Sequence, residues 1–141
     1  MRDPIGPARA AEPAECLDLV ATAISDGDLD AALAQYEQAA VLHPWQDPRG
    51  RPLTVAGGLA ALMELRLPLV VRVENVVLAD GIALVLGCWR LSGTGPDCER
   101  VDLRGCGGTT VRWQPGGGWL IAADAWQLDD VSPEPVRLRL A

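Results

Sequence analysis

Asp124 is the residue in this chain whose type and setting point most directly to chemistry. It stands inside the apolar stretch 118–126, and strand alternation puts four residues on one face there: Leu120, Ala122, Asp124 and Trp126. Burying a carboxylate among apolar side chains is costly unless hydrogen bonds or a use of its charge compensate. Burial also raises the pKa of a carboxyl group, so Asp124 is a candidate general acid or base.

Asp124 has a purely structural alternative, in which its carboxylate is bonded to Thr109, Tyr36 or the backbone. Tyr36, the single tyrosine, is a second candidate for chemistry, because its hydroxyl could donate a hydrogen bond to a ligand carbonyl. It could equally reach Asp124 or a loop. The residue types leave both readings open for each side chain.

His43 is the single histidine and the third candidate, as a general base. Strand alternation turns Leu42 inward and His43 outward, unless Pro44 bends the strand. A catalytic role for His43 therefore depends on the local path of the chain.

Composition limits the classes of partner. The chain has 141 residues and a net charge of −7, which argues against binding a nucleic-acid backbone. No apolar run is long enough to cross a membrane, and the Pro-rich start has no apolar signal core. We expect no membrane partner and a soluble, cytoplasmic protein. The absence of Lys and Phe indicates a GC-rich bacterial genome.

The cysteines give no metal-binding pattern. The four are Cys16, Cys88, Cys98 and Cys106, with no CxxC spacing and one histidine in the chain. A zinc site is therefore not expected. We expect reduced thiols, with Cys16 and Cys88 packed inside; a Cys98–Cys106 bridge is the alternative.

Three helices and one short strand are expected in the first half of the chain. Apolar spacing and capping residues mark their limits. The elements are a helix over 13–25, a second helix capped by Asp28 with Leu29, Leu33 and Tyr36 on one face, a strand over 40–43, a polar loop over 45–52, and a third helix capped by Thr54.

An antiparallel meander is expected in the second half. The strands are 69–79, 82–91, 100–114 and 119–128, and Asp80-Gly81 forms the first hairpin turn. Gly105, Gly107 and Gly108 suggest a bulge or sharp bend in the third of these strands. We expect a disordered start over 1–11, one domain over 12–128 and a tail over 129–141. In the tail, apolar residues at 136, 138 and 140 alternate with arginines, so it could add an edge strand.

The order of these elements resembles the nuclear transport factor 2-like superfamily. The resemblance is carried by residues 27–31 leading to Tyr36, by 40–44, by the hairpin 80–85, and by 118–126. The last segment is most similar to SnoaL-like polyketide cyclases, many of which end in Trp-x-Ile-x-x-Asp-x-Trp. The resemblance implies an α+β fold, in which a cone-shaped, curved, mostly antiparallel sheet wraps around three N-terminal helices.

Ketosteroid isomerase belongs to the same superfamily, and its catalytic residues are mostly missing here. The position of its catalytic base matches Pro44, and that of its oxyanion-stabilising Asp matches Thr109. Its tyrosine network matches Val20, Tyr36 and Met63, so only Tyr36 remains. Steroid-type isomerase activity is therefore not expected.

The resemblance turns Asp124 and Trp126 toward the inside of the cone. Strand parity then predicts a pocket lined by tryptophans, with the alternative that these rings simply fill the core. The predicted ligand-binding residues are Leu42, Met63, Val85, Trp89, Thr109, Val111, Trp113 and Trp126.

The expected function is binding of a small hydrophobic molecule, with acid–base isomerisation, cyclisation or dehydration in bacterial secondary metabolism as the implied chemistry. Asp124, Tyr36 and His43 would be the catalytic residues, without a cofactor or metal. A non-catalytic binding or accessory protein is the alternative, and a structural dimerisation module a third. We expect a homodimer through the outer sheet face, which would carry Cys88, Thr110 and Trp119.

Overall fold

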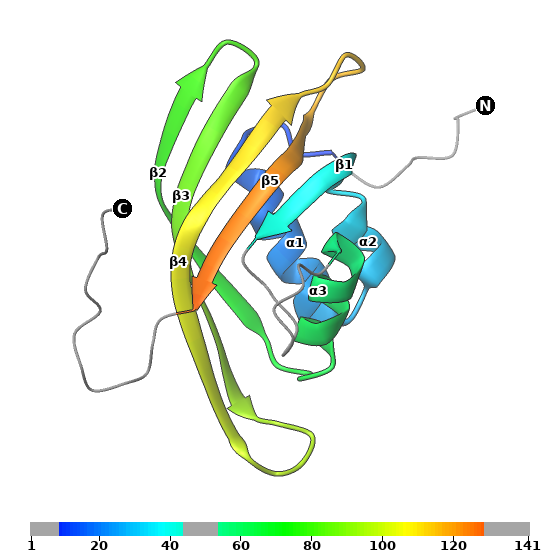
Figure 1. Ribbon diagram of the computed structural model, residues 1–141, viewed down its shortest axis with the longest axis vertical. Helices are drawn as coiled ribbons and strands as arrows, with labels where there is room; N and C mark the ends of the chain where they lie inside the picture. Colours follow the sequence, from blue (N-terminus) through cyan, green and yellow to red (C-terminus); the bar gives the residue numbers. More distant parts are fainter. Residues whose placement is uncertain (1–8, 44–53, 129–141) are drawn as a thin grey trace.

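The computed structural model describes residues 9–43 and 54–128. Within them, helices pack against one face of a curved five-stranded sheet (Figure 1). The helices are α1 (Glu15–Asp26), α2 (Leu29–Leu33) and α3 (Val55–Met63); the strands are β1 (Tyr36–His43), β2 (Leu69–Ala79), β3 (Ile82–Thr94), β4 (Arg100–Trp113) and β5 (Trp119–Leu128).

The sheet order is β1-β5-β4-β3-β2. Its pairs are antiparallel apart from β1 with β5, which run parallel. The expected α+β fold with a mostly antiparallel sheet is confirmed. The polar loop expected over 45–52 and the tail over 129–141 lie outside the described residues.

Helix ends follow the expected capping chemistry. The Asp28 side chain accepts a hydrogen bond from the Ala31 N–H at 3.0 Å, and Thr54 accepts one from the Gly57 N–H at 3.0 Å. Gly27, at φ 71°, ends α1 in the left-handed conformation that glycine tolerates best.

Tyr36 lies on a strand and not on the second helix, where the apolar spacing had placed it. Helix α2 ends at Leu33, and the chain enters β1 at Tyr36, four residues before the expected strand start. The Ile121 N–H donates to the Gln35 carbonyl at 2.8 Å, which ties this entry to β5. Pairing with β5 thus outweighs the weak helical pattern of this short segment.

A β-bulge in β5 corrects the expected face of that strand. Thr110 pairs with Ala123, whereas Val111 pairs with Ile121, so Ala122 is the extra residue. The bulge resets the alternation, and Ile121 points inward together with Asp124. The expectation that Leu120 and Ala122 share the face of Asp124 is therefore wrong, whereas Asp124 and Trp126 are buried as expected.

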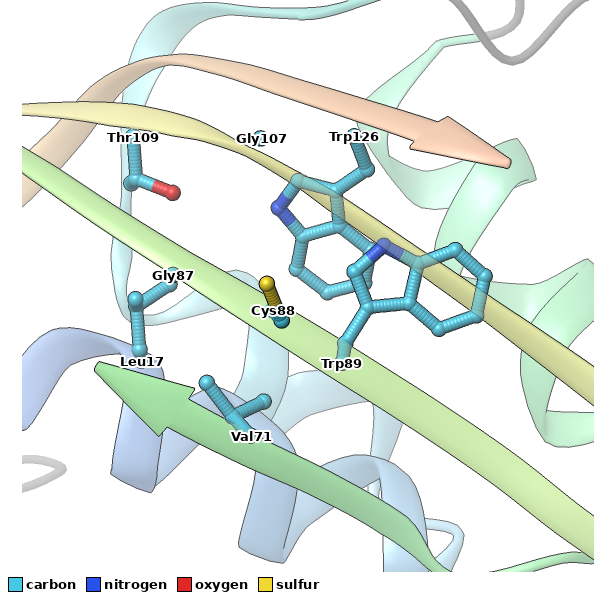
Figure 2. A pocket seen from close by; sticks show the side chains of 8 residues that line it. All are labelled: Leu17, Val71, Gly87, Cys88, Trp89, Gly107, Thr109 and Trp126. Atoms are coloured by element: carbon cyan, nitrogen blue, oxygen red, sulfur yellow. The ribbon is translucent and has the colours of Figure 1, made fainter. Parts of the chain in front are cut away.

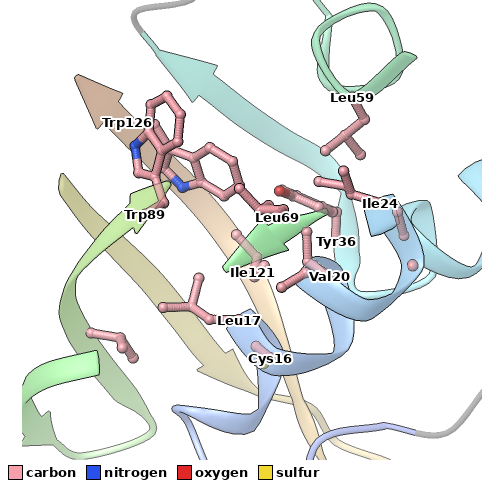
Figure 3. Close-up of a cluster of buried hydrophobic side chains, with 14 of the residues drawn as sticks. Cys16, Leu17, Val20, Ile24, Tyr36, Leu59, Leu69, Trp89, Ile121 and Trp126 are labelled. Carbon is pink, nitrogen blue, oxygen red and sulfur yellow. The ribbon is translucent and has the colours of Figure 1, made fainter. Parts of the chain in front are cut away.

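The core lies between α1 and the inner face of the sheet (Figure 3). Apolar residues at three-to-four spacing along α1 meet residues from β3 and β5. The labelled members are Cys16, Leu17, Val20 and Ile24 from α1, Leu59 from α3, and Tyr36, Leu69, Trp89, Ile121 and Trp126 from the sheet.

Glycines in β4 let neighbouring backbones approach closely, but they do not form the expected bulge. Gly105, Gly107 and Gly108 pair in regular register with both neighbouring strands. A Cβ at Gly107 would overlap the carbonyl oxygen of Ala125. The absence of a side chain at Gly107 therefore allows β5 to lie where it does.

The cysteine pairing differs from both expectations. Cys88 and Cys106 face each other on β3 and β4 and form a disulfide, so Cys88 is not a packed thiol and Cys98 is not the partner of Cys106. Cys98 is exposed and free. Cys16 is buried as expected, and burial raises the pKa of its thiol to about 12.

Two further expectations about exposure are corrected. Trp119 is buried on the inner side of the sheet, so it is not an outer-face residue, and its backbone N–H donates to the Ala10 carbonyl at 2.9 Å. Ala10 is itself fully buried, so the disorder expected for 1–11 does not extend to it. Within residues 9–43 and 54–128, no helix has both the length and the apolar character to cross a membrane.

Candidate functional site

A buried carboxylate held by hydroxyl groups is the centre of the candidate site. Asp124 on β5 is only 1% exposed. The Thr109 hydroxyl donates to its Oδ1 at 2.6 Å, and the Tyr36 hydroxyl donates to its Oδ2 at 2.9 Å. The Trp126 side chain adds a further hydrogen bond. These contacts satisfy the carboxylate and offset the cost of burying it.

Sheet pairing brings these side chains together. Thr109 on β4 lies directly opposite Asp124, and Leu42 on β1 lies opposite it on the other side. Tyr36 reaches the carboxylate from the start of β1, 88 positions away along the chain. The cluster therefore depends on the β1–β5–β4 order of strands and not on any local motif.

The pKa of the Asp124 carboxyl group lies close to neutral pH. Burial raises the pKa of Asp124 to about 6, against the lowering effect of its hydrogen bonds from Thr109, Tyr36 and Trp126. Burial and the nearby carboxylate raise the pKa of Tyr36 well above its usual value. At neutral pH the pair is mainly a carboxylate and a neutral phenol that donates to it.

Little space remains beside Trp89 and Trp126 on the inner side of the sheet (Figure 2). Trp89 and Trp126 pack with ring centroids 5.9 Å apart, and the cavity beside them measures about 10 Å³. That volume holds about one water molecule. The lining residues are Leu17, Val71, Gly87, Cys88, Trp89, Gly107, Thr109 and Trp126. This part of the interior therefore agrees with the filled-core alternative.

A larger pocket lies between α2, the start of β1 and α3. Its volume is about 450 Å³, within the range of small-molecule sites. It is lined by Leu33, Tyr36, Glu37, Gln38, Ala40, Thr54, Val55 and Ala56. Tyr36 lines this pocket and also bonds Asp124, so it connects the surface pocket to the buried carboxylate.

The other predicted ligand-binding residues lie elsewhere. Val85 and Val111 are fully buried in the core, and Met63 packs against it from α3. Leu42 is buried in close contact with Gly58 of α3. Trp113 is 48% exposed and packs edge-on against Trp119 at 5.6 Å, so the expectation that it lines the cone is wrong.

His43 ends β1, where its backbone pairs with Ala125. The hypothesis that its side chain is a general base stays a prediction. Within the described residues, no group of three or more His, Cys, Asp or Glu side chains could hold a metal ion.

Most residues lining the larger pocket were missed by sequence reasoning. The pocket forms where β1 passes α3, so its lining comes from segments that only the fold brings together. The available signal was Thr54, recognised as a helix cap, together with Tyr36, the single tyrosine.

Comparison with known proteins gives the fold. No protein-family model and no curated protein matches the sequence. A ketosteroid isomerase-like protein from Erwinia carotovora atroseptica matches with TM-score 0.67 at 19% identity, covering 83% of this chain and 93% of its own. An NTF2-like protein from Cytophaga hutchinsonii matches with TM-score 0.61 at 15% identity, covering 82% and 94%. The chain has the nuclear transport factor 2-like fold.

A third structure with the nuclear transport factor 2-like fold is an established enzyme. The Δ5-3-ketosteroid isomerase from Mycobacterium sp. matches with TM-score 0.56 at 17% identity, covering 82% of this chain and 92% of its own. At such identities the likeness concerns the fold, and activity has to be argued from the site.

Proposed function

We propose that this protein binds a small, largely apolar molecule in the pocket between α2, β1 and α3. The observation that carries the proposal is the position of Tyr36, which lines that pocket while its hydroxyl is fixed on the buried Asp124. Apolar lining from Leu33, Ala40 and Val55 would hold the body of the molecule. The Tyr36 hydroxyl would meet its polar group.

Acid–base chemistry through Tyr36 is the catalytic form of this proposal. When Asp124 is protonated it can donate to the Tyr36 oxygen, which frees the Tyr36 hydroxyl to donate to a ligand oxygen. A pKa of about 6 for Asp124 supports such a change near neutral pH. The reaction would be an isomerisation, cyclisation or dehydration in bacterial secondary metabolism, as in polyketide cyclases. Asp124 and Tyr36 would carry the proton transfer without a cofactor.

Non-catalytic binding is the second candidate. It is favoured by the small size of the cavity beside Trp89 and Trp126 and by the engagement of both Asp124 oxygens with Thr109 and Tyr36. A direct attack by the carboxylate on a substrate would first have to break one of these bonds.

The first experiment locates the ligand. We would titrate the protein with 2-acetylnaphthalene and 2-ethylnaphthalene and follow the change in tryptophan fluorescence. The larger side chain of Ala56→Trp should fill the pocket and weaken the binding of each compound about tenfold or more. Ala61→Trp is the control, because Ala61 is exposed on the same helix and does not line the pocket. Equal binding by both variants would contradict the assigned pocket.

The second experiment tests Tyr36 and separates binding from catalysis. At pH 5, where Asp124 is mainly protonated and the Tyr36 hydroxyl is free to donate to the ligand, Tyr36→Phe should weaken binding of the ketone about fivefold and leave binding of the hydrocarbon unchanged, the effect of one lost hydrogen bond. Exchange of the ketone's α-protons in D₂O reports proton transfer next to a carbonyl. Exchange that falls ~10²-fold or more in Asp124→Asn would support catalysis. Binding without exchange above buffer would support the non-catalytic form.

The cytoplasmic location stays a proposal, supported by the sequence composition alone. The Cys88–Cys106 disulfide gives it a test, because such bonds are rare in reducing compartments. Alkylation of the protein in intact cells should find Cys88 and Cys106 reduced if the location is cytoplasmic.

A further inference from the structure

The edge of β2 that faces away from β3 has no partner strand within residues 9–43 and 54–128, and it borders a groove that carries negative charge. β2 is the outermost strand of the sheet on this side (Figure 1). Between β2 and α1 lies a groove of about 370 Å³, lined by Asp18, Ala21, Thr22, Ser25, Asp26, Leu69, Val70 and Val71. Asp18 and Asp26 are exposed there, and Val70 is 64% exposed on the strand beside them.

The backbone of β2 offers hydrogen-bonding groups along this edge. The Ser25 side chain of α1 contacts both backbone polar groups of Leu69. The Leu69 N–H donates to the Ser25 hydroxyl at 2.9 Å, and that hydroxyl lies 3.5 Å from the Leu69 carbonyl oxygen. Leu69 therefore directs these groups away from β3. Since a strand repeats every two residues, Val71 and Val73 direct theirs to the same edge. An extended segment could pair with them.

A segment of this chain has the matching pattern. Residues 136–140 read Val-Arg-Leu-Arg-Leu, so in a strand the arginines share one face and the apolar residues the other. The arginine face matches Asp18 and Asp26, and the apolar face matches the exposed Val70. The opposite edge of the sheet, formed by β1, suits the arginines less well. Its acid within the described part of β1 is Glu37, which already contacts Arg112 at 3.2 Å and Gln114 at 2.9 Å.

The segment is long enough to reach the groove. In register, Leu128 at the end of β5 pairs with Gly105, Gly105 with Trp89, and Trp89 with Val71. Three strand spacings separate Leu128 from Val71, and a strand added beyond β2 lies a fourth spacing away, or about 19 Å in all. Residues 129–135 can span up to about 23 Å when extended. The chain can therefore cross the outer face of the sheet within this length.

We propose that residues 136–141 add a strand to the β2 edge of the same molecule, with Arg137 and Arg139 facing Asp18 and Asp26. Pairing at this edge would cover backbone groups that otherwise offer a template for aggregation. This inference stands apart from the ligand pocket, which lies between α2, β1 and α3.

Amide hydrogen exchange of β2 tests the proposal. In the full chain the Val71 and Val73 amides should be protected, and deletion of 136–141 should lower that protection about tenfold or more. Arg137→Glu with Arg139→Glu, and Asp18→Asn with Asp26→Asn, should each do the same. Asp97→Asn with Glu99→Gln removes equal charge from the exposed β3–β4 turn and should change nothing.

Peptide addition and charge reversal test the same contact between the tail and β2. A peptide of residues 134–141 added to the truncated chain should restore protection, and the peptide with Glu at 137 and 139 should not. Asp18→Arg with Asp26→Arg should rescue the charge-reversed tail. Unchanged protection on deletion would overturn the proposal, as would protection that rises with protein concentration, because that would assign the edge to a second copy.

Discussion

At the scale of single residues, Asp124 combines deep burial with a full set of donors. Thr109 and Tyr36 each hold one of its oxygens, yet its pKa is still raised to about 6 because desolvation exceeds the effect of the bonds. The same carboxylate is therefore well bonded and still costly to ionise. This balance makes its charge state measurable through stability.

Asp124 should make the protein less stable as pH rises from about 4 to about 6. Its pKa is raised from 3.8 to about 6, so the folded state binds the extra proton in that window. Preferential protonation of Asp124 in the folded state stabilises the protein fully below pH 3.8, and this contribution is lost above pH 6. The free energy of unfolding should therefore fall by roughly 3 kcal/mol across this window. Asp124→Asn should lack this loss.

Urea unfolding of both proteins at pH 4 and pH 7 measures that difference. The other carboxyl groups are shared, so their effects cancel in the comparison. Parallel pH dependence in the two proteins would show that Asp124 does not titrate in this range.

Thr109→Val should lower the free energy of unfolding at pH 7 by roughly 1–3 kcal/mol, because a buried carboxylate loses its 2.6 Å donor. It should also raise the pKa of Asp124 further, since the Thr109 bond lowers that pKa. Thr110→Val is the matched control, because Thr110 is the next residue and points to the other face. Equal effects of the two variants would contradict the role given to Thr109.

At the scale of elements, close backbone approach between β4 and β5 sets the position of Asp124. Gly107 pairs with Trp126 and Gly108 with Ala125, so both glycines lie beside the strand that carries the acid. Their surroundings differ. A Cβ at Gly107 would overlap the Ala125 carbonyl oxygen, whereas one at Gly108 would meet the flexible side chains of Leu84 and Leu86 at 3.2 and 3.4 Å.

Gly107→Ala should therefore destabilise the protein by ~1–3 kcal/mol or more, because backbone cannot yield as a side chain can. Gly108→Ala should stay within about 1 kcal/mol of the parent protein. Urea midpoints of the two variants give the comparison. A tolerated Gly107→Ala would mean that β5 can move away without loss.

At the scale of the whole molecule, the outer face of the sheet is too apolar to be an ordinary surface. Ile82, Leu84 and Leu86 of β3 and Val77 of β2 are exposed on it. Ion pairs border this area, among them Arg72 with Glu74 at 2.8 Å. Apolar centres with polar borders are typical of protein interfaces.

The protein should sediment as a homodimer at micromolar concentration, and Leu84→Glu should produce the monomer. A charge in the middle of the apolar area would have to be buried unpaired in the dimer. Ala61→Glu, on an exposed position of α3, should leave the dimer intact. Circular dichroism is the control that each variant is folded. A monomeric parent protein would contradict this prediction.

The sequence by itself determined the elements and their order. Capping by Asp28 and Thr54, the Asp80-Gly81 turn and strand alternation are local properties, so most helices and strands fall close to their expected limits. Alternation put Asp124 and Trp126 on one face, and the family resemblance turned that face inward, where both are buried. A carboxylate within an apolar strand was also sufficient to identify the centre of the candidate site.

Tertiary structure alone decided how distant segments meet. The bulge at Ala122 depends on the register between β4 and β5, so alternation along one strand misplaced Leu120 and Ala122. Tyr36 became a strand residue because β5 offered it hydrogen bonds that a five-residue helix could not. Cys88 pairs with Cys106 because β3 and β4 place them opposite each other. Each outcome rests on contacts between strands far apart in sequence, which local patterns do not encode.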